Sequence, residues 1–215
     1  MTGPRPSDLF ASRVLPLRRE RLALLVIDAQ NWVMDEKNRQ PRPEFYADVK
    51  SFVIPDIMRL LAHGRRHGVE IIYTVMENLT EDGRDRGLDY KLSNFFIARG
   101  SRDAKVIDAL APGRDELVIP KTSSSLFNST NFEYLIRNIG IDTIAVVGFL
   151  TDQCIDHTIR DGADRGFHMI SVSDACASDT RVRHEAALNA FKGYCRNETT
   201  ATLITAMDKD FAAAQ

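Results

Sequence analysis

Three side chains of complementary chemistry each follow a run of apolar residues in this chain. Asp28 comes directly after the run 22–27, Lys121 follows 117–119 and a proline, and Cys154 comes shortly after 143–150. A thiolate is a strong nucleophile, and a nearby carboxylate can accept the thiol proton. A lysine can stabilise the charges that form. Together the three residue types indicate nucleophilic catalysis by a thiol, although each of them alone has a simpler explanation.

Cys154 is a candidate nucleophile because a helix is expected to begin beside it. The pattern predicts a helix over 152–165, closed by Gly166, with Thr151 as its N-cap. Cys154 would then lie in the first turn, where the helix dipole favours a thiolate by up to about 2 kcal/mol and lowers the thiol pKa. From position alone, a buried thiol that only fills space explains Cys154 equally well. The other two cysteines, Cys176 and Cys195, are interpreted as fillers.

Asp28 and Lys121 are the candidate partners of this thiol. A carboxylate beside a dry sheet is desolvated, which raises its pKa and suits a general base. Lys121 would pair with Asp28 and favour the thiolate. The simpler explanations are a capping carboxylate at a strand end and an exposed lysine. Three complementary groups at three strand ends make the catalytic interpretation the better one.

Other chemical motifs receive little support. His63 and His67 have the i, i+4 spacing of metal ligands, but without the acid of H-E-x-x-H they are interpreted as two surface histidines. His157 lies on the same expected helix as Cys154, where an in-line pair is rarely possible. The chain has no G-x-S-x-G, P-loop or G-x-G-x-x-G motif, which argues against serine hydrolases, NTPases and simple dinucleotide binders.

The elements that would position these residues alternate between strands and helices. Short apolar runs predict strands, and helical spacing between them predicts right-handed βαβ units with a parallel sheet. The expected fold is a three-layer α/β domain, with an N-terminal arm over 1–20 and one domain over 21–215. Ligands of such sheets bind outside the carboxyl ends of the strands, where the three candidates fall. The predicted strands are 22–27, 69–75, 117–119, 143–150, 168–173 and 201–204, and the predicted helices are 52–61, 132–136, 152–165 and 181–194.

Composition limits the classes of function. The formal net charge is −2, whereas a nucleic-acid binder usually has an excess of basic residues. The chain contains no run of 18 apolar residues that could span a membrane. The first residues contain no apolar segment of the kind that a secretory signal needs. Three cysteines are an odd and sparse set, which favours a reducing compartment. We therefore expect a cytoplasmic protein with no nucleic-acid or membrane partner.

Several segments together resemble the isochorismatase-like cysteine hydrolases. They are Leu24-Leu25-Val26-Ile27-Asp28-Ala29-Gln30-Asn31, Val118-Ile119-Pro120-Lys121 and Val147-Gly148-Phe149-Leu150-Thr151-Asp152-Gln153-Cys154, with Arg160–Gly166 and Asp174–Ala177 further on. The resemblance covers about 20–206. It implies a Rossmann-like fold with a six-stranded parallel sheet, and a homo-oligomer, either a dimer or a tetramer.

The resemblance also implies a catalytic arrangement. It carries an Asp–Lys–Cys triad onto Asp28, Lys121 and Cys154. It implies a cis peptide bond at Phe149–Leu150, with the backbone amides of Leu150 and Cys154 turned toward one oxyanion position. Apart from the resemblance, Trp32, Tyr90 and Phe127 are candidates to line an apolar substrate pocket, although such aromatic residues more often belong to the core or to an interface.

Substrate and cofactor expectations follow from the same resemblance. Nicotinamidases of the family bind a metal after the second strand, but 77–83 contains no histidine here, so neither a metal nor another cofactor is expected. True isochorismatases can lack the cysteine, so the presence of Cys154 favours cleavage of a C–N bond in a small linear amide, ureido or carbamoyl compound. The segment 86–91 resembles the insertion of members that act on such compounds. The alternatives are a vinyl ether hydrolase with Asp28 as general acid, and a non-catalytic protein that acts in binding or assembly.

Overall fold

A computed structural model describes residues 13–213. Within this range six strands form one parallel sheet in the order β3-β2-β1-β4-β5-β6. The predicted three-layer α/β fold is confirmed. The strands are β1 Leu22–Ile27, β2 Glu70–Met76, β3 Leu117–Lys121, β4 Thr143–Phe149, β5 His168–Ala177 and β6 Arg196–Glu198.

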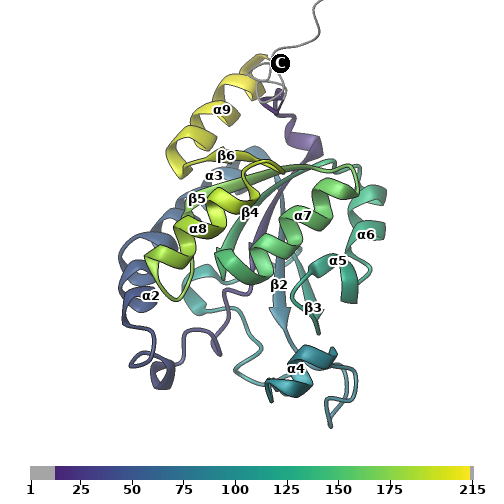
Figure 1. The fold of residues 1–215 in the computed structure, drawn as a ribbon. Helices are drawn as coiled ribbons and strands as arrows, with labels where there is room; N and C mark the ends of the chain where they lie inside the picture. Colours follow the sequence, from purple (N-terminus) through teal and green to yellow (C-terminus); the bar gives the residue numbers. More distant parts are fainter. Residues whose placement is uncertain (1–12, 214–215) are drawn as a thin grey trace, which may run out of the picture.

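Helices cover both faces of the sheet, with α7 and α8 in front of it and α3 behind it in Figure 1. The helices α3 and α9 pack on each other over β1 and β4. Both faces of the sheet are therefore dry, which explains why every residue of β1 and β4 is buried and why these strands are apolar runs. The helices are α2 Pro43–Asp48, α3 Ile54–His67, α4 Leu88–Leu92, α5 Leu126–Ser129, α6 Phe132–Ile139, α7 Asp156–Asp164, α8 Arg181–Phe191 and α9 Thr200–Ala213.

The prediction of the sixth strand was wrong. The residues 201–204 belong to α9, and the edge strand is the short polar segment Arg196–Glu198. Asp174 Oδ1 accepts hydrogen bonds from Thr200 N at 2.7 Å and from Thr200 Oγ1 at 2.9 Å, which fixes the start of the helix. Leu203, Met207 and Phe211 then recur every four residues and are buried, which is the pattern of one helix face.

The predicted N-terminal arm is described only in part, because 1–12 lie outside the described residues. Leu17 is buried, and its backbone N–H donates a hydrogen bond to Asp210 of α9 at 2.8 Å. His168 at the start of β5 lies 2.7 Å from the backbone oxygen of Arg13. The part of the segment that is described therefore packs on the domain. No helix within 13–213 is both long and apolar enough to cross a membrane.

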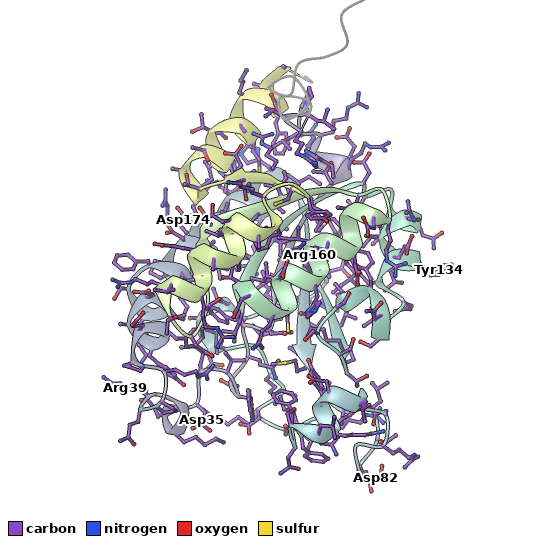
Figure 2. All side chains as sticks on the ribbon, in the orientation of Figure 1. Asp35, Arg39, Asp82, Tyr134, Arg160 and Asp174 are labelled. Atoms are coloured by element: carbon purple, nitrogen blue, oxygen red, sulfur yellow. The ribbon has the colours of Figure 1, made fainter. Side chains whose placement is uncertain are left out.

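The carboxyl ends of the strands meet at one end of the molecule. Ile27 pairs with Thr74 on one side and with Gly148 on the other, and Met76 pairs with Lys121. In Figure 1 the arrowheads of β2 and β3 point toward α4. Asp35 and Asp82, from the loops after β1 and β2, lie at the same end in Figure 2. The sheet therefore brings the residues at the C-terminal ends of β1, β3 and β4 close together.

Gly148 permits the close contact of β4 with β1. Its φ of +116° is disfavoured for other residues, and a Cβ at this position would overlap the carbonyl oxygen of Ile27. We expect Gly148→Ala to lower the free energy of unfolding by at least about 3 kcal/mol, measured by urea denaturation. Gly193→Ala is the control, because no atom lies within 4 Å of its added Cβ. A Gly148→Ala variant as stable as this control would contradict the close packing.

Candidate active site

The structure brings three side chains together at the C-terminal ends of the strands. They belong to Asp28, Lys121 and Cys154. Lys121 Nζ lies 2.8 Å from Asp28 Oδ2 and 3.3 Å from Cys154 Sγ. All three residues are buried, with exposed fractions of 1%, 1% and 5% in chain order. The structure therefore brings together the three candidates, which are separated by more than ninety and by more than thirty residues of sequence. The arrangement places a thiol, a carboxylate and an ammonium within contact of one another.

The Asp28 carboxylate is held from two sides. Thr74 Oγ1 of β2 donates a hydrogen bond to Asp28 Oδ1 at 2.8 Å, while Lys121 pairs with the other oxygen. Asp28 has a φ of +53°, and aspartate is one of the few residues that tolerate this region. Its backbone N–H still bonds the carbonyl of Thr74 at 3.1 Å. The carboxylate is thus fixed in position just beyond the end of β1.

Lys121 is fully buried but keeps its charge because of its neighbours. Burial alone would lower its pKa, but the negative charge of Asp28 more than offsets this effect and raises the pKa of Lys121 above its ordinary value. The ammonium also donates a hydrogen bond to the backbone oxygen of Ser123 at 3.1 Å. Its three N–H groups therefore face a carboxylate, a carbonyl and the sulfur. This geometry makes Lys121 a fixed positive charge.

The environment of Cys154 differs from the prediction. Thr151 does not cap a helix, because its hydroxyl lies 2.8 Å from Nδ1 of His184, and Thr151–Ile155 form one π-helical turn before α7. Burial raises the pKa of Cys154 to about 12, although Lys121 opposes this effect, and the Asp28 carboxylate raises it further. The resting side chain is therefore a neutral thiol and needs a base. The expectation of a pKa lowered by the helix dipole was wrong because desolvation is the larger effect.

The peptide bond between Phe149 and Leu150 is cis, as the resemblance implied. Phe149 is buried and packs edge-to-face on Phe45 of α2, with ring centroids 5.2 Å apart. Leu150 and Cys154 both line the cavity described next. Their backbone amides are the ones expected to hold an oxyanion.

Asp28 and Cys154 line a cavity of about 580 Å³. Trp32 and Tyr90 line it, together with Phe95, whose ring lies 4.5 Å from that of Trp32 and 4.8 Å from that of Tyr90. Phe127 does not line this cavity. It is buried in the core against Phe132 and Phe167, because α5 turns this side chain toward α6. Two of the three expected pocket residues therefore lie at the cavity.

The cavity also contains polar residues that sequence reasoning missed. Arg42 and Asp179 lie on its wall, 3.5 Å apart, and Gln153 and Asp89 also line it. Nothing in the local sequence marks Arg42 or Asp179, because they come from segments that are far apart in the chain. Thr74 was detectable in principle, since it is a polar residue inside the apolar run of β2.

A parallel α/β sheet with a buried carboxylate, lysine and cysteine at its carboxyl edge has the architecture of a cysteine hydrolase. The chain matches the isochorismatase domain over residues 22–208. It therefore belongs to the isochorismatase family of hydrolases.

Several relatives of this chain have described activities or structures. The chain is 31% identical to N-carbamoylsarcosine amidase from Arthrobacter sp over 156 residues, which cover 70% of this chain but only 57% of that amidase. It is 26% identical to the ureidoacrylate amidohydrolase RutB of Rhizobium rhizogenes, with 79% of this chain and 78% of that enzyme covered. The crystal structure of a cysteine hydrolase from Pseudomonas syringae pv. phaseolicola superposes with a TM-score of 0.80 at 27% identity, covering 91% and 96% of the two chains. Two of these relatives are thus ureido or carbamoyl amidohydrolases.

Proposed function

We propose that this protein is a cysteine amidohydrolase that cleaves a C–N bond of a small linear amide, ureido or carbamoyl compound through a thioester. The observation that carries the proposal is the contact of one buried ammonium, Lys121, with both the Asp28 carboxylate and the Cys154 sulfur, two groups that line a cavity. The names of the ureido and carbamoyl relatives support the class of substrate.

The first half of the reaction forms the thioester. Asp28 accepts the thiol proton of Cys154, and the sulfur attacks the carbonyl carbon. As the C–S bond forms, the electron pair of the carbonyl moves to its oxygen, which the backbone amides of Leu150 and Cys154 hold. Protonated Asp28 then gives its proton to the leaving nitrogen, and the C–N bond breaks. Ammonia or an amine departs, and the acyl group stays on sulfur.

The second half regenerates the enzyme. A water molecule gives a proton to Asp28 and attacks the thioester carbon. The C–S bond breaks, and the proton returns from Asp28 to the sulfur. Lys121 stays charged throughout and balances whichever of Asp28 and Cys154 carries the negative charge. The neutral resting thiol fits this sequence, because the base acts only when the substrate is in place.

A substrate panel tests the proposal. Purified full-length protein is incubated with short-chain amides, N-carbamoyl amino acids, ureido acids and isochorismate, with release of ammonia or amine measured for the first three. We expect ammonia or amine release from a carbamoyl or ureido compound. Cleavage of isochorismate alone would favour the vinyl ether hydrolase, and no turnover of any class would favour the non-catalytic alternative. The expected dimer or tetramer stays a prediction, which light scattering would measure.

Tyr90 should contribute to substrate binding. Its hydroxyl is buried at the cavity, lacks a well-formed hydrogen bond within the described chain and has Ser124 as a polar neighbour. Burial raises the pKa of Tyr90, so the hydroxyl stays a donor. Tyr90→Phe should lower kcat/KM about 10-fold, because the bound substrate loses one hydrogen bond.

The control for this prediction is Tyr134→Phe. Tyr134 lies on the outer surface of α6, away from the cavity (Figure 2). The kcat/KM of Tyr134→Phe should equal that of the unchanged protein. If Tyr90→Phe also had an unchanged kcat/KM, Tyr90 would not contribute to substrate binding.

A further inference from the structure

Two histidines and one aspartate converge at the end of the molecule opposite the candidate active site. His63 and His67 lie in the last part of α3, and Asp208 lies on α9. One ligand atom from each residue lies within 4.8 Å of the other two. Because α3 ends just before β2 begins, this cluster lies near the amino ends of the strands, whereas Cys154 lies beyond their carboxyl ends. The cluster is therefore separate from the catalytic residues.

The spacing of these atoms matches that of a metal site. His63 Nε2 lies 3.2 Å and His67 Nε2 lies 3.8 Å from the same oxygen, Asp208 Oδ1. Ligands at about 2.0–2.1 Å from a tetrahedral zinc ion lie about 3.3–3.4 Å from one another. The first distance is close to this value. The second needs a shift of a few tenths of an ångström, which the partly exposed side chains of His67 and Asp208 can make.

His63 supplies an independent observation. It is only 4% exposed, so the interpretation of His63 as a surface histidine, which rested on the missing acid of H-E-x-x-H, was wrong. Its Nε2 is buried, and it makes no well-aligned hydrogen bond with the described residues, even though Asp208 is close. A buried nitrogen whose contact with the nearest acceptor is poorly aligned costs free energy. A metal ion between His63, His67 and Asp208 would satisfy this nitrogen.

The surrounding groups permit this occupant. The guanidinium of Arg66 lies 3.2 Å from Nδ1 of His63, and a ring bound to metal through Nε2 carries its proton on that Nδ1. Arg66 is exposed and can turn into solvent, which leaves the Nδ1 proton to water. The other close ring is that of Phe211, with its centroid 5.7 Å from that of His67. It packs beside His67, and Asp208 is the most exposed of the three ligands.

We propose that His63, His67 and Asp208 bind one divalent transition-metal ion of the zinc class, with water as a fourth ligand. Imidazole and carboxylate donors suit this class of ion, and two histidines one helical turn apart plus a third ligand from another element are a common arrangement. The ion would join α9 to α3. The ion would lie far from Asp28, Lys121 and Cys154 and could not take part in their chemistry. Its role would therefore be structural.

The test uses tag-free, full-length protein treated with EDTA and dialysed, titrated with ZnCl2 by calorimetry and with CoCl2 by visible absorption. We expect one equivalent of zinc and the intense absorption of four-coordinate cobalt. Zinc at about 100 times its Kd should raise Tm by roughly 5–10 °C. His67→Gln and Asp208→Asn, which change partly exposed side chains and should fold, should each weaken binding at least about 10-fold and lose the shift in Tm.

The control separates this site from the catalytic thiol, because cysteine also binds zinc. Cys154→Ala should bind zinc as tightly as the unchanged protein. The proposal is overturned if the unchanged protein shows no saturable binding. It is also overturned if both His67→Gln and Asp208→Asn bind zinc normally, or if Cys154→Ala loses the binding.

Discussion

Cys154→Ala should abolish hydrolysis of the ureido or carbamoyl substrate, with kcat at least about 10⁴-fold lower than in the unchanged protein. In the proposed mechanism the sulfur forms the covalent bond to the acyl group, and neither Asp28 nor Lys121 beside it can replace it. Alanine leaves the cavity and the ion pair in place. Ammonia release under saturating substrate measures the loss, and mass spectrometry of acid-quenched enzyme should detect an acyl adduct on Cys154 in the unchanged protein alone.

The matched control is Cys195→Ala. Cys195 is also a buried thiol, but its sulfur lies against the backbone of Phe191 at the far end of α8. This variant should keep its kcat. If Cys154→Ala kept most of the activity, the nucleophile would be something other than this thiol. Retained cleavage of a vinyl ether would then indicate acid catalysis by Asp28.

The sheet could be predicted from sequence because its strands are buried on both faces. The run Leu22–Ile27 is apolar throughout, and the structure gives β1 the same bounds. The edge strand Arg196–Glu198 has no such pattern, since only its pairing with β5 makes it a strand. The apolar residues of 201–204 are ambiguous over so short a window, and the hydrogen bonds of Thr200 to Asp174 make them helical.

The site could be predicted in part for a similar reason. In a parallel sheet, the residues that follow strands share one edge, so Asp28, Lys121 and Cys154 could be grouped without knowing any distance. The direction of a helical side chain depends on packing, and Phe127 therefore points into the core rather than into the cavity. The pKa of Cys154 depends on how much water reaches the sulfur. The position of Cys154 in the sequence predicted the effect of a helix dipole on its pKa. It did not predict the burial, whose effect on this pKa is larger.

Lys121→Met should remove activity and stability together. The variant leaves the Asp28 carboxylate buried next to an apolar side chain, without its cation, while the hydroxyl of Thr74 still donates a hydrogen bond to it. Removing one partner of a buried ion pair costs about 3–5 kcal/mol of folding free energy. We expect a loss of that size in urea denaturation, followed by the fluorescence of the single tryptophan, Trp32. The exposed Lys192→Met should change stability by less than about 0.5 kcal/mol.

The double variant Asp28→Asn/Lys121→Met separates the two roles of this pair. Asparagine tolerates the positive φ of Asp28 and can still accept the hydrogen bond of Thr74, while no buried charge remains. Its stability should therefore return to within about 1–2 kcal/mol of the unchanged protein. Its activity should stay lost, because neither the base nor the fixed positive charge is present.

If the double variant were as unstable as Lys121→Met, the loss of stability would come from packing of the lysine side chain rather than from the isolated carboxylate. A double variant that recovered activity would show that the ion pair serves the fold and not the chemistry.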